Sequence, residues 1–226
     1  MGTDKVTAAH PRSDEIVAHL SAADKKLARL IQVAGSFNLQ PQKGTIFSGL
    51  MKSIVYQQLS GKAAGTIHGR VLALLPTNPR EHAAAIATLP DEALRGAGLS
   101  RNKLLSIRDL AARSSAGLVP ERKSLARKTD EEIIELLTEV RGVGRWTAEM
   151  ILMFTLGRLD VLPVADLGIR KGFALTFLKK SEQQELPALD VIHKQGERWK
   201  PFRSAAAWYL WRACDLAAQK SADVAW

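Results

Sequence analysis

The chain has 226 residues, 46% of them hydrophobic and 24% charged, which is the balance of a protein with a sizeable core in one large domain or two small lobes. Its formal net charge of +9 favours polyanionic partners. No run of about 18 apolar residues predicts a membrane span, residues 1–15 lack the apolar core of a secretory signal, and the single cysteine, Cys214, excludes an internal disulfide.

Helical periodicity dominates the chain from residue 45 onward. Apolar residues spaced i, i+3, i+4, i+7 predict a helix over 45–60, and Gly61 begins a second. Ser100 and Thr129 are predicted N-caps, and Thr129 with Glu132 matches a capping box. The expected helices are 45–60, 61–75, 79–89, 91–96, 100–116, 129–140, 146–156, 166–178 and 201–218. Pro163 interrupts the one β-rich run, 161–164, so the sequence predicts an all-α fold of roughly ten helices.

Basic residues are concentrated between Arg101 and Lys128, where eight lysines and arginines stand against two acidic residues. This local excess predicts a phosphate-facing surface. A solvated helix face has the same composition and is the alternative.

The segment 137–148 predicts a tight turn between two helices. Gly142 and Gly144 flank Val143, and glycines leave room for a phosphate to approach the backbone. The amides of Gly144, Arg145 and Trp146 then lie at a helix N-terminus, which favours an anion. Such contacts bind a phosphate backbone without distinguishing bases. An ordinary helix–helix corner with two turn glycines is the alternative.

The pattern Leu-x-x-Val-x-Gly-Val-Gly-x-x-Thr-Ala in this segment resembles the hairpin of the helix-hairpin-helix DNA glycosylase superfamily. The resemblance implies phosphate binding by Gly142, Gly144, Arg145, Trp146 and Thr147. It also implies a catalytic aspartate about twenty residues later, where Asp166 follows the Pro163 segment and begins a helix. A purely structural N-cap is the alternative role for Asp166.

Position 146 divides this superfamily. Members that also cut the DNA backbone have a lysine there, which forms a Schiff base with the sugar. This chain has Trp146, which implies a monofunctional enzyme without lyase activity. Gly-Arg-Trp-Thr-Ala resembles the 3-methyladenine DNA glycosylase II branch, and this resemblance places Trp146, Trp211, Tyr56 and Met150 in the base pocket. Simple core packing is the alternative for Trp146.

Two further roles follow from the same branch. The segment 53–64 resembles the junction that fills the gap left by a flipped nucleotide, which makes Gln58 the duplex plug with Gln57 beside it. The best-known members have leucine at this position, and a solvated helix end is the alternative. Hairpins of this superfamily also hold a monovalent cation, Na or K, on backbone carbonyls, here those of Thr138, Val140 and Val143.

The resemblance implies a two-lobed, all-α helix-hairpin-helix glycosylase fold, in a short form without the N-terminal β domain, with the active site in the interlobe cleft. One lobe comprises 46–156 and the other 1–45 plus 157–226. The implied reaction is hydrolysis of the N-glycosidic bond of alkylated bases, of the 3-methyladenine type, in double-stranded DNA by base flipping, which initiates base excision repair. No organic cofactor and no membrane partner are expected, and we expect a monomer in the cytoplasm at the nucleoid. A non-catalytic lesion-binding module and a glycosylase for uracil or oxidised purines are the alternatives.

Overall fold

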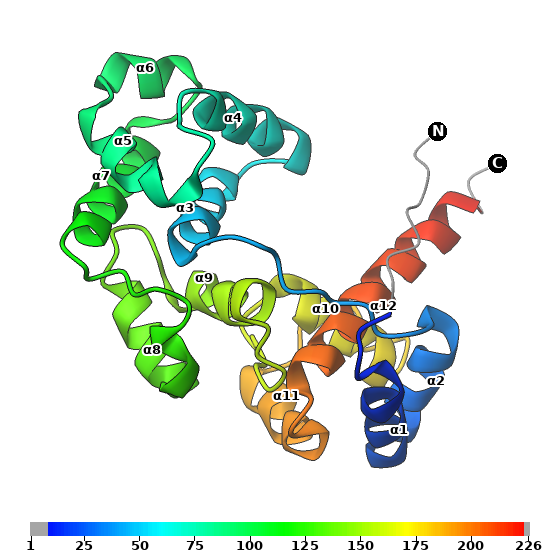
Figure 1. Ribbon diagram of the computed structural model, residues 1–226. Coiled ribbons are helices and arrows are strands. Elements are labelled where there is room, and N and C mark those ends of the chain that lie inside the picture. Colours follow the sequence, from blue (N-terminus) through cyan, green and yellow to red (C-terminus); the bar gives the residue numbers. More distant parts are fainter. Residues whose placement is uncertain (1–8, 224–226) are drawn as a thin grey trace. The chain divides into compact units, whose positions relative to one another are not determined.

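The computed structural model describes residues 9–223, in which every regular element is a helix (Figure 1). The all-α prediction is confirmed. Within these residues there are twelve α-helices: α1 (Ser13–Ala23), α2 (Lys25–Ala34), α3 (Ile46–Tyr56), α4 (Gly61–Ala73), α5 (His82–Thr88), α6 (Asp91–Gly96), α7 (Arg101–Ser115), α8 (Asp130–Thr138), α9 (Arg145–Met150), α10 (Leu167–Phe177), α11 (Leu189–Gly196) and α12 (Arg203–Asp223). Among the described helices we find none with the length and hydropathy of a membrane span.

The chain forms two compact units. One comprises Met1–Pro41 with Gly157–Trp226, and the other comprises Gln42–Leu156. In the first unit α10 packs against α12, and α2 packs against both of these helices. Its core includes the fully buried Phe37, Trp199 and Tyr209.

The 42–156 unit is built around α3, which packs against α4, α7 and the segment after α9. The predicted apolar stripe of α3 is buried, and the Thr45 side chain caps the helix by accepting from the Ser48 amide at 3.0 Å. The helix ends at Tyr56, four residues before the predicted end: Gln57 has an extended ψ of 131° and Gln58 a positive φ of 57°.

The two helices of the hairpin differ in how well the sequence predicts them. The capping box of α8 is confirmed, since Glu132 accepts from the Thr129 amide at 2.6 Å and the Glu132 amide donates back to Thr129 Oγ1 at 3.2 Å. The predicted single helix over 146–156 is instead α9 followed by a π-helix, η3 (Ile151–Leu156). A 3.6-residue pattern over eleven residues does not distinguish an α-turn from a π-turn.

Candidate active site and DNA interface

Asp166 stands at the N-cap of α10, as the sequence predicts. Its Oδ1 accepts a hydrogen bond from the Ile169 amide at 2.9 Å and a second from the indole Nε1 of Trp211, on α12, at 2.8 Å. The side chain is half-buried rather than sealed in the core. The capping bond fixes the carboxylate to its own helix, and the indole fixes it to a second helix.

Gly168 allows Trp211 to approach Asp166. A Cβ atom at position 168 would lie 2.7 Å from Trp211 Cδ1, closer than real Cβ contacts, and 3.1 Å from Asp166 Oδ1, which is also tight. The neighbouring Cys214, which is half-buried, donates to the Gly168 carbonyl at 3.3 Å, and burial raises the pKa of its thiol. The pairing of Trp211 with Asp166 was not predicted, although the small residue two positions after Asp166 was a visible sign of close packing.

Two arginines of this unit have structural partners. Arg203 pairs with Asp160 at 2.7 Å. The Nε and Nη2 atoms of Arg170 donate to the Pro187 carbonyl. Both arginines therefore connect segments within this unit.

The hairpin turn between α8 and α9 has one packed side and one open side. Gly142 has a φ of 76°, and a Cβ there would lie 2.6 Å from Ser106 Oγ on α7. Gly144, the N-cap of α9, is extended, and a Cβ there would meet no atom within 4 Å. Because glycine has no side chain to cap α9, the helix N-terminus is left open to an external anion.

The charge beside this turn is more balanced than the sequence suggests. Arg145 pairs with Glu131 at 2.5 Å and with the buried Glu149 at 3.2 Å, and its guanidinium lowers the pKa of Glu131. Thr147 is only 3% exposed, so its side chain packs inside the unit and does not extend toward a phosphate. Of the predicted phosphate ligands, Gly144 therefore has the backbone most accessible to a phosphate.

Three of the basic residues of 101–128, which the sequence predicts to form a phosphate-facing surface, have partners inside their own unit. Lys103 donates to the carbonyls of Val55 and Gln57, both at 2.8 Å. Arg108 pairs with Asp91, and Arg113 pairs with Asp109 and Glu139. Lys103, Arg108 and Arg113 are therefore bound to carbonyl or carboxylate groups of their own unit.

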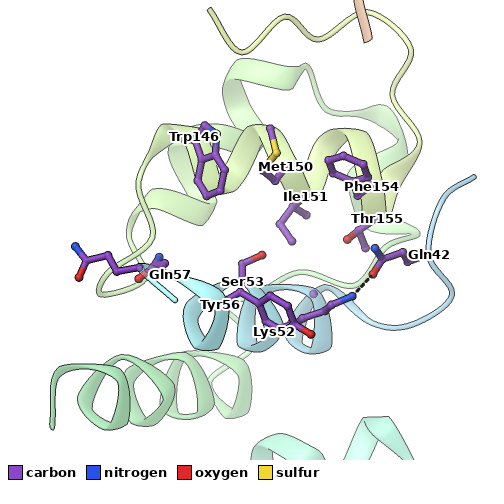
Figure 2. A pocket seen from close by; sticks show the side chains of 12 residues that line it. Gln42, Lys52, Ser53, Tyr56, Gln57, Trp146, Met150, Ile151, Phe154 and Thr155 are labelled. Atoms are coloured by element: carbon purple, nitrogen blue, oxygen red, sulfur yellow. Dashed lines mark hydrogen bonds between the residues drawn. The ribbon is translucent and has the colours of Figure 1, made fainter. Parts of the chain in front are cut away.

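A cavity of about 470 Å³ lies between α3 and the α9–η3 segment (Figure 2). It brings together three of the predicted base-pocket residues: Tyr56 from α3, and Trp146 and Met150 from α9. Trp146 is 45% exposed, which excludes the core-packing alternative. The fourth predicted residue, Trp211, lies in the other unit with Asp166.

The loop after α3 contains the two predicted plug residues in different settings. Gln58 is exposed and has the left-handed backbone that bulky residues rarely adopt, which costs about 1 kcal/mol or more. The Gln57 side chain instead donates to the Gly142 carbonyl at 2.9 Å, which links this loop to the hairpin. Lys103 holds the same loop by its backbone, and burial lowers the pKa of its ammonium group. The role of Lys103 in holding this loop was not predicted, because its partners lie more than forty residues away.

The hairpin also offers a donor set that fits a monovalent cation. The α8 helix ends at Thr138, so the carbonyls that follow lie at the negative end of its dipole. The Val140 carbonyl accepts from the Val143 amide at 3.0 Å, and a carbonyl oxygen has a second lone pair for an ion. No cluster of acidic, histidine or cysteine side chains suited to a metal ion is found among the described residues.

Comparisons with known proteins agree with this architecture. Residues 51–194 match the HhH-GPD superfamily base excision DNA repair protein family. DNA-3-methyladenine glycosylase 1 of Schizosaccharomyces pombe is 35% identical over 201 residues, which cover 88% of this chain and 86% of that protein. DNA-3-methyladenine glycosylase of Saccharomyces cerevisiae is 31% identical, over 74% of this chain and 66% of that protein.

Two solved structures resemble this chain over most of its length. The S. pombe 3-methyladenine DNA glycosylase in complex with abasic DNA has a TM-score of 0.78 and 34% identity, over 90% of this chain and 98% of that one. A DNA-3-methyladenine glycosidase from Bacillus halodurans has a TM-score of 0.79 and 35% identity, over 92% of this chain and 93% of that one. This chain therefore belongs to the HhH-GPD superfamily of base excision DNA repair proteins.

Proposed function

We propose that this protein is a DNA glycosylase that hydrolyses the N-glycosidic bond of alkylated bases, of the 3-methyladenine type, in duplex DNA. The names of its relatives support this activity. The observation that carries the proposal is the carboxylate of Asp166, half-buried at the start of α10 and oriented by two hydrogen-bond donors. A lesion-binding module without catalysis has no need for a carboxylate held in this way.

Asp166 acts at the sugar. As the bond between C1′ and the base nitrogen breaks, the base leaves with the bonding electrons and positive charge develops on the sugar ring. A fixed carboxylate stabilises that charge and orients the attacking water, from which it accepts a proton. The products are the free base and an abasic site, and hydrolysis requires no organic cofactor.

The cavity beside Trp146 receives the flipped base. An exposed indole next to Tyr56 offers a surface on which a planar base stacks. Gln58, exposed on its left-handed loop, fills the gap in the duplex. Gln57 supports that loop through the Gly142 carbonyl.

The hairpin binds the phosphate backbone through the open turn at Gly144 and the N-terminus of α9. A Na or K ion on the carbonyls of Thr138, Val140 and Val143 would stabilise this turn and take no part in bond cleavage. Double-stranded DNA is the partner, and we place the protein as a monomer in the cytoplasm at the nucleoid. With tryptophan at position 146, the enzyme leaves the abasic strand uncut.

The test is Asp166→Asn, assayed on a duplex with a single methylated purine. The amide keeps the size of the side chain and removes its charge, so we expect base release to fall at least about a hundredfold while DNA affinity is retained. Borohydride should trap no covalent complex with wild-type protein. Undiminished base release by the variant would assign the chemistry to another group.

A further inference from the structure

One face of α7 contacts the two loops of the 42–156 unit that the proposed function assigns to DNA. Its residues Lys103, Ser106 and Asp109 are spaced three apart, so each is a neighbour of the next on the helix surface. Lys103 binds the loop after α3, whereas Ser106 and Asp109 lie against the hairpin turn. One helix therefore supports both loops.

The Lys103 ammonium binds the backbone immediately before the proposed plug, Gln58. Its Nζ donates to the carbonyls of Val55 and Gln57, each at 2.8 Å. A hydrogen bond from a charged donor is stronger than one between neutral groups, and a cation is favoured at the negative C-terminal end of a helix such as α3. The Gln57 carbonyl belongs to the peptide that joins Gln57 to Gln58, so Lys103 restrains the plug residue through its backbone.

Gln58 has a backbone conformation that the surrounding structure has to hold. Its φ of 57° lies in the left-handed region, which a residue other than glycine keeps only where its neighbours fix the chain. The bonds that fix this loop include those of the Lys103 ammonium and that of the Gln57 side chain to the Gly142 carbonyl. Because the Gln58 side chain is itself exposed, its direction depends on this support of the backbone.

The hairpin turn is bound to the same face of α7. Asp109 Oδ2 accepts from the Arg141 amide at 2.8 Å, and Gly142 lies so close to Ser106 that a Cβ at position 142 would be 2.6 Å from the hydroxyl oxygen. The Gln57 side chain joins the turn to the loop after α3 at 2.9 Å. The loop and the turn are thus fixed to one helix and to each other.

We propose that Lys103 is a positioning residue for the duplex plug, which it holds in a fixed place relative to the hairpin turn. This inference rests on the proposed function and adds a residue to its base-flipping step. A loop that is already ordered loses little conformational entropy when Gln58 enters the gap left by the flipped nucleotide. Without the Lys103 bonds, each flipping event has to order the loop as well, so base release slows although the carboxylate of Asp166 is unchanged.

The test uses Lys103→Met in single-turnover assays at saturating enzyme, on two duplexes of one sequence. Each carries one methylated purine, placed opposite either its complementary base or a tetrahydrofuran abasic analogue. Flipping breaks a base pair and leaves an unpaired base only in the first duplex, so the variant should lose about tenfold in rate there and less than about threefold on the second. Equal losses on both duplexes, or no loss on either, would overturn the positioning role.

Arg95→Met, which removes an exposed cation from α6 in the same unit, is the matched control and should change neither rate. Lys103→Gln repeats the comparison if the methionine variant does not fold. Wild-type protein that releases no methylated base from either duplex would refute the proposed function itself.

A double-mutant cycle with Gln58→Ala shows whether Lys103 acts through the plug. If it does, Gln58→Ala alone slows release from the fully paired duplex, and adding Lys103→Met slows it by no more than about a further twofold. Losses that multiply, or a Lys103→Met defect beside a Gln58→Ala variant of wild-type rate, would show that Lys103 acts by another route and would overturn the inference while the proposed glycosylase activity stands.

Discussion

The Asp166 carboxylate depends on a residue 45 positions away in the sequence, Trp211. Its indole donates to the same oxygen that caps α10, so α12 helps to fix the direction of the carboxylate. We infer that Trp211 is a positioning residue for Asp166. Its value to the reaction lies in this bond rather than in the size of its ring.

Trp211→Phe separates the hydrogen bond from the ring. Loss of a bond to a charged acceptor should lower the single-turnover rate constant about tenfold or more, while the dissociation constant for DNA stays within about twofold. The measurement is base release under saturating enzyme, beside DNA binding by fluorescence anisotropy.

Trp208→Phe is the matched control for this experiment. Trp208 lies on the same helix and packs edge-on against Phe37 with ring centroids 5.5 Å apart, so its replacement should reduce stability without changing the rate constant. Equal rate losses in the two variants would mean that the α12 packing, and not the Asp166 bond, controls the chemistry.

The sequence predicts which residues form the site better than it predicts the hydrogen-bond partners of those residues. Asp166 as an N-cap is confirmed, and Tyr56, Trp146 and Met150 line one cavity as predicted. The partners of Asp166 and Gln57 were not predicted, because each bond joins segments that only the folded chain brings together. Their catalytic and plug roles remain predictions.

Among the elements, the hairpin combines a closed turn with an open helix end. Position 142 requires glycine, because its φ is positive and a Cβ there would meet Ser106. Position 144 is extended and has open space where a side chain would lie. The two glycines therefore serve different purposes. Gly142 makes the turn, and we propose that Gly144 leaves room for the phosphate.

Gly144→Val tests this division without disturbing the fold. The backbone of Gly144 suits any residue, so the free energy of unfolding should change by less than about 1 kcal/mol. A branched side chain blocks approach to the α9 amides, and affinity should fall about tenfold for every duplex sequence alike.

Gly96→Val, at the end of α6 where a Cβ also meets no atom within 4 Å, controls for the effect of adding a valine. An affinity loss restricted to particular DNA sequences would contradict a contact to the phosphate backbone.

The sequence predicts some helix ends better than others. The caps at Ser100, Thr129 and Asp166 are found where predicted, because a cap depends on neighbours within three residues. The early end of α3 and the π-helix after Met150 were not predicted. At the first, Lys103 of a distant helix donates to the carbonyls of Val55 and Gln57, and the second leaves the spacing of apolar residues nearly unchanged.

For the whole molecule, the net charge does not show which cations are available to bind DNA. The value of +9 is a property of the chain, but several cations of 101–128 and Arg145 have internal acidic or carbonyl partners. A count of lysines and arginines along the sequence does not distinguish a DNA-facing cation from a structural one. Their partners in the fold make that distinction.

The proposed function divides binding and chemistry between the two units. Gly144 lies in Gln42–Leu156, and Trp211 lies with Asp166 in the unit formed by Met1–Pro41 and Gly157–Trp226. If Gly144 contributes to affinity and Trp211 to the rate of bond cleavage, then Gly144→Val and Trp211→Phe act on separate steps. Their effects on kcat/KM should multiply, with a coupling free energy within about 0.5 kcal/mol.

The measurement is a double-mutant cycle on kcat/KM for one methylated duplex. Wild type, both single variants and the double variant are compared at the same salt concentration, because phosphate contacts depend on salt. A coupling of about 1 kcal/mol or more, in either direction, would show that the hairpin and the carboxylate act as one cooperative unit. In that case phosphate binding at Gly144 would itself orient Asp166, and the separation of binding from chemistry would be wrong.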